Sequence, residues 1–328
     1  MKGVDVVAHI LKEEKVDYLF CFPANKLIDS AAKVGIRPIM TRAERTLVNM
    51  ADGFSRISNG NQIGVAVVQS GPGSENAFAG VAQAFADSIP ILMLPGGVRR
   101  RSGDIPTHFS SVKNYAHVTK WVAQANFADR LPNMLRRAYS LLRSGHLAPV
   151  MIEIPTDVGE EEVSDYVYTP PKPIKSIADP VNVRNAVDSL LMAKKPILFI
   201  GQGSLFAEAS PSLIRLAEML QIPVMTTMGG KGTFPENHPL SVGASGLTGS
   251  GVVKHFLSKA DLILGIGSSM SKNTFAPQVP SRVPIIHNTA SETDINKDCV
   301  ATVALLGDAR LVTDQLIDEI AVSYTHLR

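Results

Sequence analysis

Residues 63–76, IGVAVVQSGPGSEN, decide the fold of the surrounding chain. Residues 63–68 form a short, valine-rich apolar run, which is typical of a strand buried on both faces of a parallel sheet. Ser70-Gly71-Pro72-Gly73 then excludes a helix or strand interior, and residues 77–87 repeat small and apolar side chains at helical spacing. A strand, a glycine loop and a helix start form a seat for an anionic or polar ligand, because the first helix amides are unpaired.

The first half of the chain alternates strands and helices around this stretch. The predicted strands are residues 18–22, 36–40, 63–68, 91–94, 121–125 and 150–154. The predicted helices are residues 4–15, 26–34, 45–58, 77–87 and 131–143. Residues 98–117 show no periodicity and predict a long functional or interface loop.

A linker precedes a second alternating series. Residues 156–180 carry Glu160-Glu161-Glu162 and several prolines without an apolar period. The helices predicted beyond it are residues 181–193, 211–220 and 309–320, and the strands are residues 197–200, 223–226, 262–266, 283–286 and 302–306. The predicted fold class is therefore α/β, with two doubly wound, mainly parallel sheets flanked by helices.

The composition describes an ordinary globular chain. Its 328 residues favour about two domains. A net charge of +2 indicates neither a nucleic-acid nor a membrane partner, and no apolar run approaches the roughly 20 residues that span a bilayer. Cys21 and Cys299 are predicted core thiols of a reducing compartment, and the eight histidines show no metal-ligand spacing. We expect a cytoplasmic protein with no metal site in this part.

A longer pattern connects Glu44 to the glycine loop. Glu44 follows Thr41-Arg42-Ala43 and opens a helix that contains the sequence ADGFSR (51–56). An asparagine-glycine turn, the valine-rich strand and the SGPG loop come next. This combination resembles the pyrimidine-binding domain of thiamine-diphosphate enzymes, specifically the acetolactate synthase group. The resemblance implies a pyrimidine-binding domain over 1–165, a linker over 166–180 and a central Rossmann-like domain over 181–321. Residues 322–328 continue neither the last predicted helix nor a family pattern, so we expect them to be a foreign tail.

The resemblance implies a cofactor, thiamine diphosphate, and a catalytic residue, Glu44. In this family a carboxyl group hydrogen-bonded to the pyrimidine ring shifts that ring to its imino tautomer, which removes the proton from the thiazolium carbon. Taken alone, a glutamate at a helix start only complements the helix dipole. The residues that the resemblance assigns to cofactor binding are Pro23, Ser70, Gly71, Pro72, Gly73 and Asn76. Gly71 and Gly73 would let the backbone approach the cofactor ring.

The sequence departs from the family where the family positions its keto-acid substrates. Ala24 replaces a glycine after Pro23, and Gly96-Gly97 stands where many members carry Gly-Gln. The Phe-Gln-Glu element of acetolactate synthases is here Phe109-Ser110-Ser111. The expected substrate-side residues are Gly97, His108, Phe109 and Ser110.

The second half carries a partial dinucleotide fingerprint. Gly201-Gln202-Gly203 lies between a predicted strand and helix, but Phe206 holds the third glycine position and no acid closes the following strand. The half resembles the family's central domain, which holds a structural FAD in acetolactate synthases. Residues 269–272 (SMSK) replace the family's Arg-Phe-Asp-Asp, so we expect no tightly bound FAD.

The resemblance implies decarboxylation and carboligation of 2-keto acids in a homodimer or homotetramer with the site at the subunit interface. The family binds diphosphate and Mg²⁺ through a Gly-Asp-Gly motif in a third domain, whereas Gly307-Asp308-Ala309 lacks the second glycine. We therefore expect an inactive, truncated chain. Two alternatives stay open: a nicotinamide-dependent oxidoreductase, and a non-catalytic structural or regulatory relative.

Overall fold

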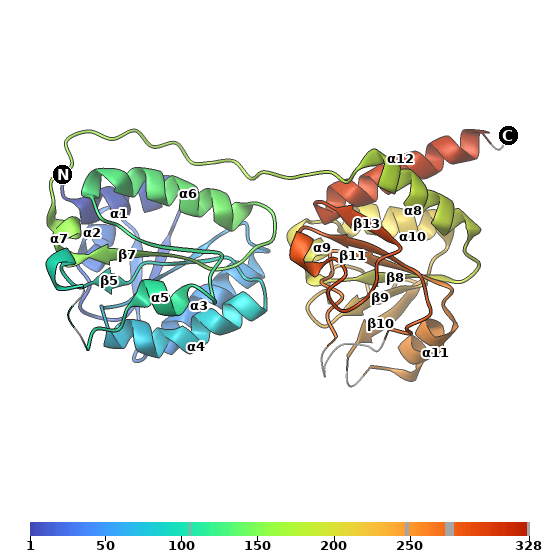
Figure 1. Cartoon of the computed structure of the whole chain (residues 1–328), viewed down its shortest axis with the longest axis horizontal. Coiled ribbons are helices and arrows are strands. Elements are labelled where there is room, and N and C mark those ends of the chain that lie inside the picture. The colour runs from blue at the N-terminus through green and yellow to red at the C-terminus, as the bar shows by residue number, and fades with distance from the viewer. Residues whose placement is uncertain (104, 106, 247–248, 273–278, 327–328) are drawn as a thin grey trace. The chain divides into compact units, whose positions relative to one another are not determined.

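The computed structural model describes residues 1–103, 105, 107–246, 249–272 and 279–326. Of residues 324–326 it describes the backbone alone. The chain divides into two compact units, Met1–Ile174 and Lys175–Arg328. Figure 1 labels their elements. Both units are parallel-sheet α/β structures, so the predicted fold class is confirmed. Among the described residues, no helix combines the length and the apolar character needed to cross a bilayer.

The first unit is built on a seven-stranded parallel sheet. Its strands are β1 (Tyr18–Cys21), β2 (Arg37–Met40), β3 (Gly64–Val67), β4 (Ile91–Met93), β5 (Gly96–Gly97), β6 (Trp121–Gln124) and β7 (Val150–Pro155). Their order is β2-β1-β3-β4-β7-β5, with β6 also paired to β7. Cys21 pairs with both Met40 and Val67, so the carboxyl ends of these three strands lie at one edge.

Helices cover both faces of this sheet. They are α1 (Gly3–Glu13), α2 (Leu27–Lys33), α3 (Glu44–Ile57), α4 (Pro72–Ala86), α5 (Ser111–Tyr115), α6 (Leu131–Arg143) and α7 (Thr156–Glu160). Helices α1, α2 and α6 pack together on one face, and α3, α4 and α5 pack together on the other (Figure 1). The core between the layers consists of apolar side chains with almost no exposed surface, among them Ile10, Leu19, Val65 and Leu92.

Two predictions for the first unit need correction. Helix α4 begins at Pro72 and not near residue 77, because proline is well suited to the first helical position, where its missing amide hydrogen costs nothing. Residues 98–117 are not one irregular loop, since they contain α5 and a single 3₁₀ turn at Arg100–Ser102. The Ser110 hydroxyl caps α5 by accepting from the Lys113 amide at 3.4 Å.

The second unit is built on a six-stranded parallel sheet. Its strands are β8 (Pro196–Ile200), β9 (Val224–Thr227), β10 (Ser241–Ser245), β11 (Leu262–Ile266), β12 (Ile285–Thr289) and β13 (Val303–Leu306), in the order β10-β9-β8-β11-β12-β13. Its helices are α8 (Pro180–Met192), α9 (Gln202–Phe206), α10 (Ser210–Leu220), α11 (Gly251–Lys259) and α12 (Ala309–His326). Helices α8 and α10 pack against α12, and α11 packs against β10.

The sequence analysis missed β10 and α11, and it ended the last helix too early. The β10 sequence, SVGAS, is only weakly apolar and half-buried, so it lacks the signal of a buried strand. Helix α12 continues to His326, so the expectation that residues 322–328 leave the helix is wrong for residues 322–326. No glycine or proline follows Ala309 to stop it. Residues 327 and 328 lie outside the described part.

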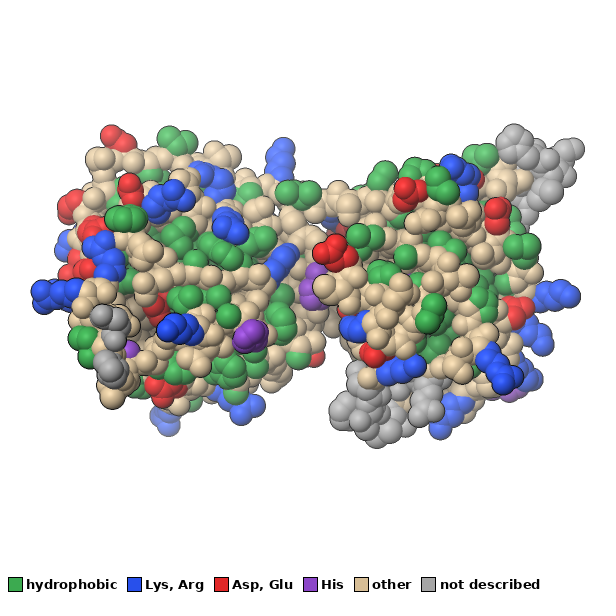
Figure 2. All heavy atoms as spheres, in the orientation of Figure 1, with side chains coloured by type: hydrophobic (Ala, Val, Ile, Leu, Met, Phe, Trp, Pro, Cys, Tyr) green, Lys and Arg blue, Asp and Glu red, His purple; other side chains and the backbone are tan. Residues whose placement is uncertain are grey.

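The segment after α7 is tied to the first unit. The Tyr168 hydroxyl donates to the Glu14 carboxylate, which also pairs with Arg143 at 2.6 Å. Arg143 Nη1 also donates to the Pro171 carbonyl at 3.3 Å. Burial and the neighbouring Glu14 raise the pKa of the Tyr168 phenol, which keeps it a donor. Positive and negative side chains are interspersed on the faces shown in Figure 2, in keeping with the small net charge.

Candidate functional site

Four strand ends of the first unit converge on one edge of the sheet. Asn25 follows β1, Glu44 follows β2, Ser70 follows β3 and Gly96 follows β4. The strand order changes direction between β1 and β3, since β2 lies on one side of β1 and the later strands lie on the other. Ligands of open parallel sheets bind at such a switch point, outside the carboxyl ends of the strands. The candidate site lies there.

Glu44 is a buried carboxylate at the first position of α3. The Ala43 backbone before it is extended, and the Glu44 residue is only 5% exposed. Among the described residues its carboxylate has one hydrogen bond, a long one of 3.4 Å from Asn76 Nδ2 to Oε2. An ionised carboxylate can accept about four hydrogen bonds. Glu44 therefore retains acceptor capacity in a place where few solvent molecules reach it.

The turn before α4 is open. Gly71 adopts φ 62° and ψ −108°, a backbone conformation that only glycine adopts readily, and a Cβ added to it would meet no atom within 4 Å. Pro72 has no amide hydrogen, and the Glu75 amide already donates to the Gly71 carbonyl at 3.0 Å. The amides of Gly73 and Ser74 have no described acceptor. The first turn of α4 thus holds two neighbouring amides without a described acceptor, both on buried residues.

Close packing explains why position 73 is a glycine. A Cβ on Gly73 would lie 2.7 Å from Gln69 Cγ and 3.3 Å from Val68 Cβ. The start of α4 therefore packs directly against the end of β3. The expected approach of the cofactor to Gly73 stays a prediction.

Asn25 and Gly96 complete this edge, and the sequence analysis assigned neither. Asn25 Nδ2 donates to the Val68 carbonyl at 3.0 Å, and its Oδ1 accepts from the Leu27 amide at 3.0 Å. The side chain thus ties the turn after β1 to the end of β3. A Cβ on Gly96 would lie 3.5 Å from Asn25 Nδ2 and 3.6 Å from the Ser70 amide. An asparagine directly before a predicted helix was the available signal for the first.

Pro23 and Ala24 form the exposed turn after β1. Ala24 has φ 76°, in the left-handed region that favours glycine. The chain therefore keeps a glycine-type conformation where the sequence carries alanine in place of the family's glycine. Cys21, at the end of β1, is buried, and burial raises the pKa of its thiol to about 11, so it is not a nucleophile at neutral pH.

Helix α5 is tied to the start of α4. Ser111 Oγ donates to Ser74 Oγ at 3.1 Å, and the Tyr115 hydroxyl donates to the Ser74 carbonyl at 2.6 Å. All three residues are fully buried. Burial raises the pKa of the Tyr115 phenol, which keeps it protonated. The segment around Phe109 and Ser110, which we expect to face substrate, is thereby anchored to the glycine loop.

The four expected substrate-side residues lie in β5 and in the segment that leads into α5. Gly97 is buried in β5, where its carbonyl accepts from Thr156 Oγ1 at 3.0 Å. His108 is exposed, Phe109 is half-buried and Ser110 caps α5. None of the four has a described hydrogen bond to Glu44 or to residues 70–76. Their role in substrate binding stays a prediction.

The glycine loop of the second unit is filled by the chain itself. A Cβ on Gly201 would lie 2.3 Å from the Gly267 carbonyl oxygen, and one on Gly267 would lie 2.3 Å from the Ser204 amide. These glycines let the turn after β8 pack on the turn after β11. Nothing observed favours the nicotinamide alternative.

The residues expected to lack flavin contacts are engaged locally. Met270 is 5% exposed, Ser269 Oγ lies 2.9 Å from Ser271 Oγ, and the Lys272 amide donates to Asp298 at 2.9 Å. Residues 273–278 lie outside the described part. The expected absence of tightly bound FAD stays a prediction.

Two family models match the chain. Residues 1–124 match the N-terminal TPP binding domain of thiamine pyrophosphate enzymes, where TPP is thiamine diphosphate, and residues 183–316 match the central domain of the same enzymes. The first match contains Glu44 and the SGPG loop. The second contains the filled loop at Gly201.

Relatives resemble the chain over nearly its whole length. It is 30% identical to a probable acetolactate synthase large subunit of Methanocaldococcus jannaschii, over 97% of this chain and 56% of that protein. The acetolactate synthase large subunits of Haemophilus influenzae (30%, 57% of the protein) and Corynebacterium glutamicum (31%, 52%) each match 97% of this chain. The chain thus spans about half the length of these curated relatives.

Proposed function

The chain belongs to the thiamine pyrophosphate enzyme family, whose N-terminal and central domains it carries, and on this premise we propose that it serves an acetolactate synthase-like reaction, the decarboxylation and carboligation of 2-keto acids. One observation carries the proposal. A buried carboxylate with spare acceptor capacity, Glu44, lies at the same sheet edge as the open Gly71 turn.

The residues present fit the pyrimidine half of thiamine diphosphate. When bound, this cofactor supplies a nucleophilic carbon that adds to the keto group of a 2-keto acid. Glu44 would accept a hydrogen bond from the pyrimidine ring or donate one to it. The Gly73 and Ser74 amides would donate to polar atoms, and the bare Gly71 backbone leaves room for the ring. Pro23, Ser70, Pro72 and Asn76 would border it.

Glu44 would hold and move a proton at its carboxylate. Its backbone is fixed at the first position of α3, so the carboxylate is held by a rigid element. The Asn76 amide restricts Oε2 and leaves Oε1 for the ligand. A proton exchanged between this carboxyl and the pyrimidine ring would give the ring the basicity that the reaction requires.

The remaining features of the proposal follow from the family resemblance and from the second unit. We propose a homodimer or homotetramer in the cytoplasm, with Mg²⁺ accompanying the cofactor. The central domain would act as a scaffold without tightly bound FAD, because its glycine loop is filled. The absorption spectrum of the purified protein checks this last point, since a flavin band near stoichiometric amount would contradict it.

The test replaces Glu44 with glutamine in the full translation product of the gene that encodes these residues. Glutamine keeps the size but cannot exchange a proton. Deuterium exchange at the reactive carbon of the bound cofactor should slow by about 10² to 10⁴, while cofactor affinity changes little. Glu75→Gln is the matched control, because Glu75 is an exposed glutamate in the first turn of α4. Unchanged exchange in the Glu44 variant would make Glu44 an ordinary helix-start residue.

A further inference from the structure

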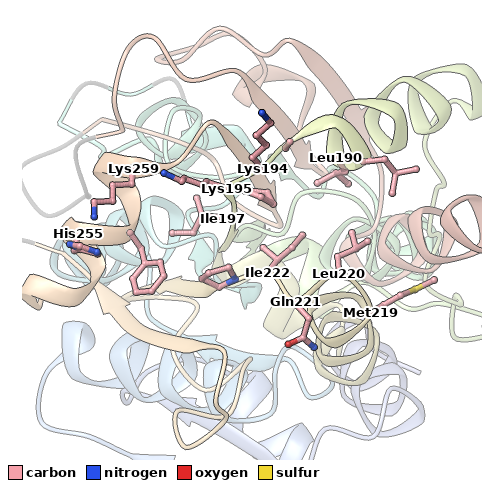
Figure 3. A pocket seen from close by; sticks show the side chains of 15 residues that line it. Leu190, Lys194, Lys195, Ile197, Met219, Leu220, Gln221, Ile222, His255 and Lys259 are labelled. Atoms are coloured by element: carbon pink, nitrogen blue, oxygen red, sulfur yellow. The ribbon is translucent and has the colours of Figure 1, made fainter.

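A cavity of about 620 Å³ lies in the second unit, away from the carboxyl ends of its strands (Figure 3). Its lining includes Pro196, where β8 begins, and Pro223, which directly precedes β9. The volume falls within the range of small-molecule sites, roughly 300 to 1,000 Å³. All its lining residues belong to the second unit, so the cavity is separate from the Glu44 site.

One end of the cavity is apolar. Leu190, Ile197 and Ile222 form a buried floor, and Met219 and Leu220 extend it (Figure 3). The Phe256 ring, whose residue is 39% exposed, also lines the cavity and lies beside the His255 ring, with centroids 5.6 Å apart. An apolar tail of a ligand would lose water on this floor, which is favourable in proportion to the area buried.

The other end of the cavity is basic. Lys195, Lys259 and His255 gather there, with Lys194 at the rim (Figure 3). Among the residues that the structure describes, no aspartate or glutamate lines the cavity. In the described part of the chain, none of the three lysines forms a salt bridge.

The nearby acid does not cancel this charge by direct pairing. The Asp261 carboxylate accepts the backbone amides of Lys194 and Lys195, each at 2.9 Å, so it is held by the main chain and leaves both ammonium groups available. Helices α8, α10 and α11 also end at this cavity, and their last carbonyls carry partial negative charge. An anionic group is therefore accommodated beside the lysine ammonium groups and not at the helix ends.

We propose that this cavity binds an amphipathic carboxylate, a small molecule with a carboxylate head and an unbranched or aromatic apolar tail. The head lies between Lys195 and Lys259, and the tail covers Ile197 and Ile222. The separation of charge from apolar surface selects this class. A small anion without a tail would leave the apolar floor exposed to water, and a neutral hydrocarbon would leave the ammonium groups without a negative partner. The proposal is independent of the proposed reaction.

Decanoate is the probe, titrated into the 328-residue chain by calorimetry at low salt. We expect one site with a Kd below about 1 mM. Acetate has the head without the tail, and decanol has the tail without the charge. Both should bind at least about tenfold more weakly. The decanoate affinity should fall as salt is added, because the lysines are exposed to solvent.

Three variants locate the site. The double variant Lys195→Glu/Lys259→Glu should weaken decanoate binding about tenfold or more. Lys254→Glu is the matched control, since Lys254 is an exposed lysine of α11 that does not line the cavity. Ala193→Trp places an indole in the cavity from its rim without removing any core side chain, and it should abolish binding.

Four results would overturn the proposal. Equal affinity for decanol would show that the basic end is not used. An equal loss in Lys254→Glu would reveal a general charge effect. Full binding by Ala193→Trp, with native circular dichroism, would place the ligand elsewhere. Absence of saturable binding below about 1 mM would also refute it.

Discussion

Both units place a glycine turn between a parallel strand and a helix, yet the two turns are built in opposite ways. In the first, a Cβ added to Gly71 would meet nothing within 4 Å. In the second, a Cβ added to Gly201 would lie 2.3 Å from the Gly267 carbonyl oxygen and 2.5 Å from Ser268 Cα. The first turn faces open space, whereas the second is occupied by its own chain.

The difference teaches that a glycine pattern alone does not identify a ligand seat. A glycine is needed either because the backbone adopts a conformation closed to other residues or because a neighbour leaves no room for a Cβ. Gly71 is of the first kind and Gly201 is of the second. A free approach to the backbone exists only in the first case, and it is the first turn that shares its sheet edge with a buried carboxylate.

Among the tests of this comparison, Gly201→Ala should have the largest effect on stability. Its Cβ meets backbone, which cannot move aside as a flexible side chain would. We expect a loss of about 3 kcal/mol in the free energy of unfolding of the second unit, measured by urea denaturation. Gly251→Ala is the control, because a Cβ there meets nothing within 4 Å and the residue begins α11. A loss below about 1 kcal/mol at Gly201 would show that the second turn is not filled.

Gly71→Ala tests the conformational need for glycine separately from the need for space. No contact opposes the new methyl group, so the cost comes from the backbone conformation, and we expect a loss of about 2 kcal/mol. Gly53→Ala, in the interior of α3 with open space around it, should stabilise slightly for comparison. Chemical denaturation of both variants measures the difference. A Gly71 variant as stable as the parent would mean that the turn relaxes freely.

The smallest effect is expected for the reverse change, Ala24→Gly, at the same sheet edge. Ala24 pays for a left-handed conformation that costs non-glycine residues about 1 to 2 kcal/mol, while glycine adds about 0.5 to 1 kcal/mol of unfolded-state entropy. The net gain should be about 0.5 kcal/mol. Thermal melting of the variant beside the parent measures it, and a clear loss would show that the alanine methyl group makes a useful contact.

Most of the fold could be predicted from the sequence because its strands are continuous apolar runs. Strands β3, β8 and β11 are buried along nearly their whole length, which gives a strong signal in a single sequence. Strand β10 is half-buried and β5 has two residues, so neither stands out from a loop. The start of α4 was missed because Pro72 was taken as a breaker, although proline favours the first helical turn.

The site could be predicted only where a residue type itself marks the chemistry. A glutamate before a helix and an SGPG loop are visible in the sequence. The tie from Tyr115 to the Ser74 carbonyl is not visible, because it joins residues 41 positions apart through a backbone acceptor. The same holds for Asn25, which reaches the Val68 carbonyl across the switch point. Such contacts depend on tertiary packing, which no local pattern records.

The proline that opens α4 has a consequence for hydrogen exchange. Pro72 has no exchangeable hydrogen, and the Glu75 amide is already bonded to the Gly71 carbonyl. The first turn of α4 therefore offers two adjacent amide protons without a described acceptor, those of Gly73 and Ser74. Because both residues are buried, their amides should exchange only when this turn opens, and more slowly still when an acceptor occupies the turn. Deuterium uptake at these two amides thus reports occupancy of the loop, one backbone position at a time.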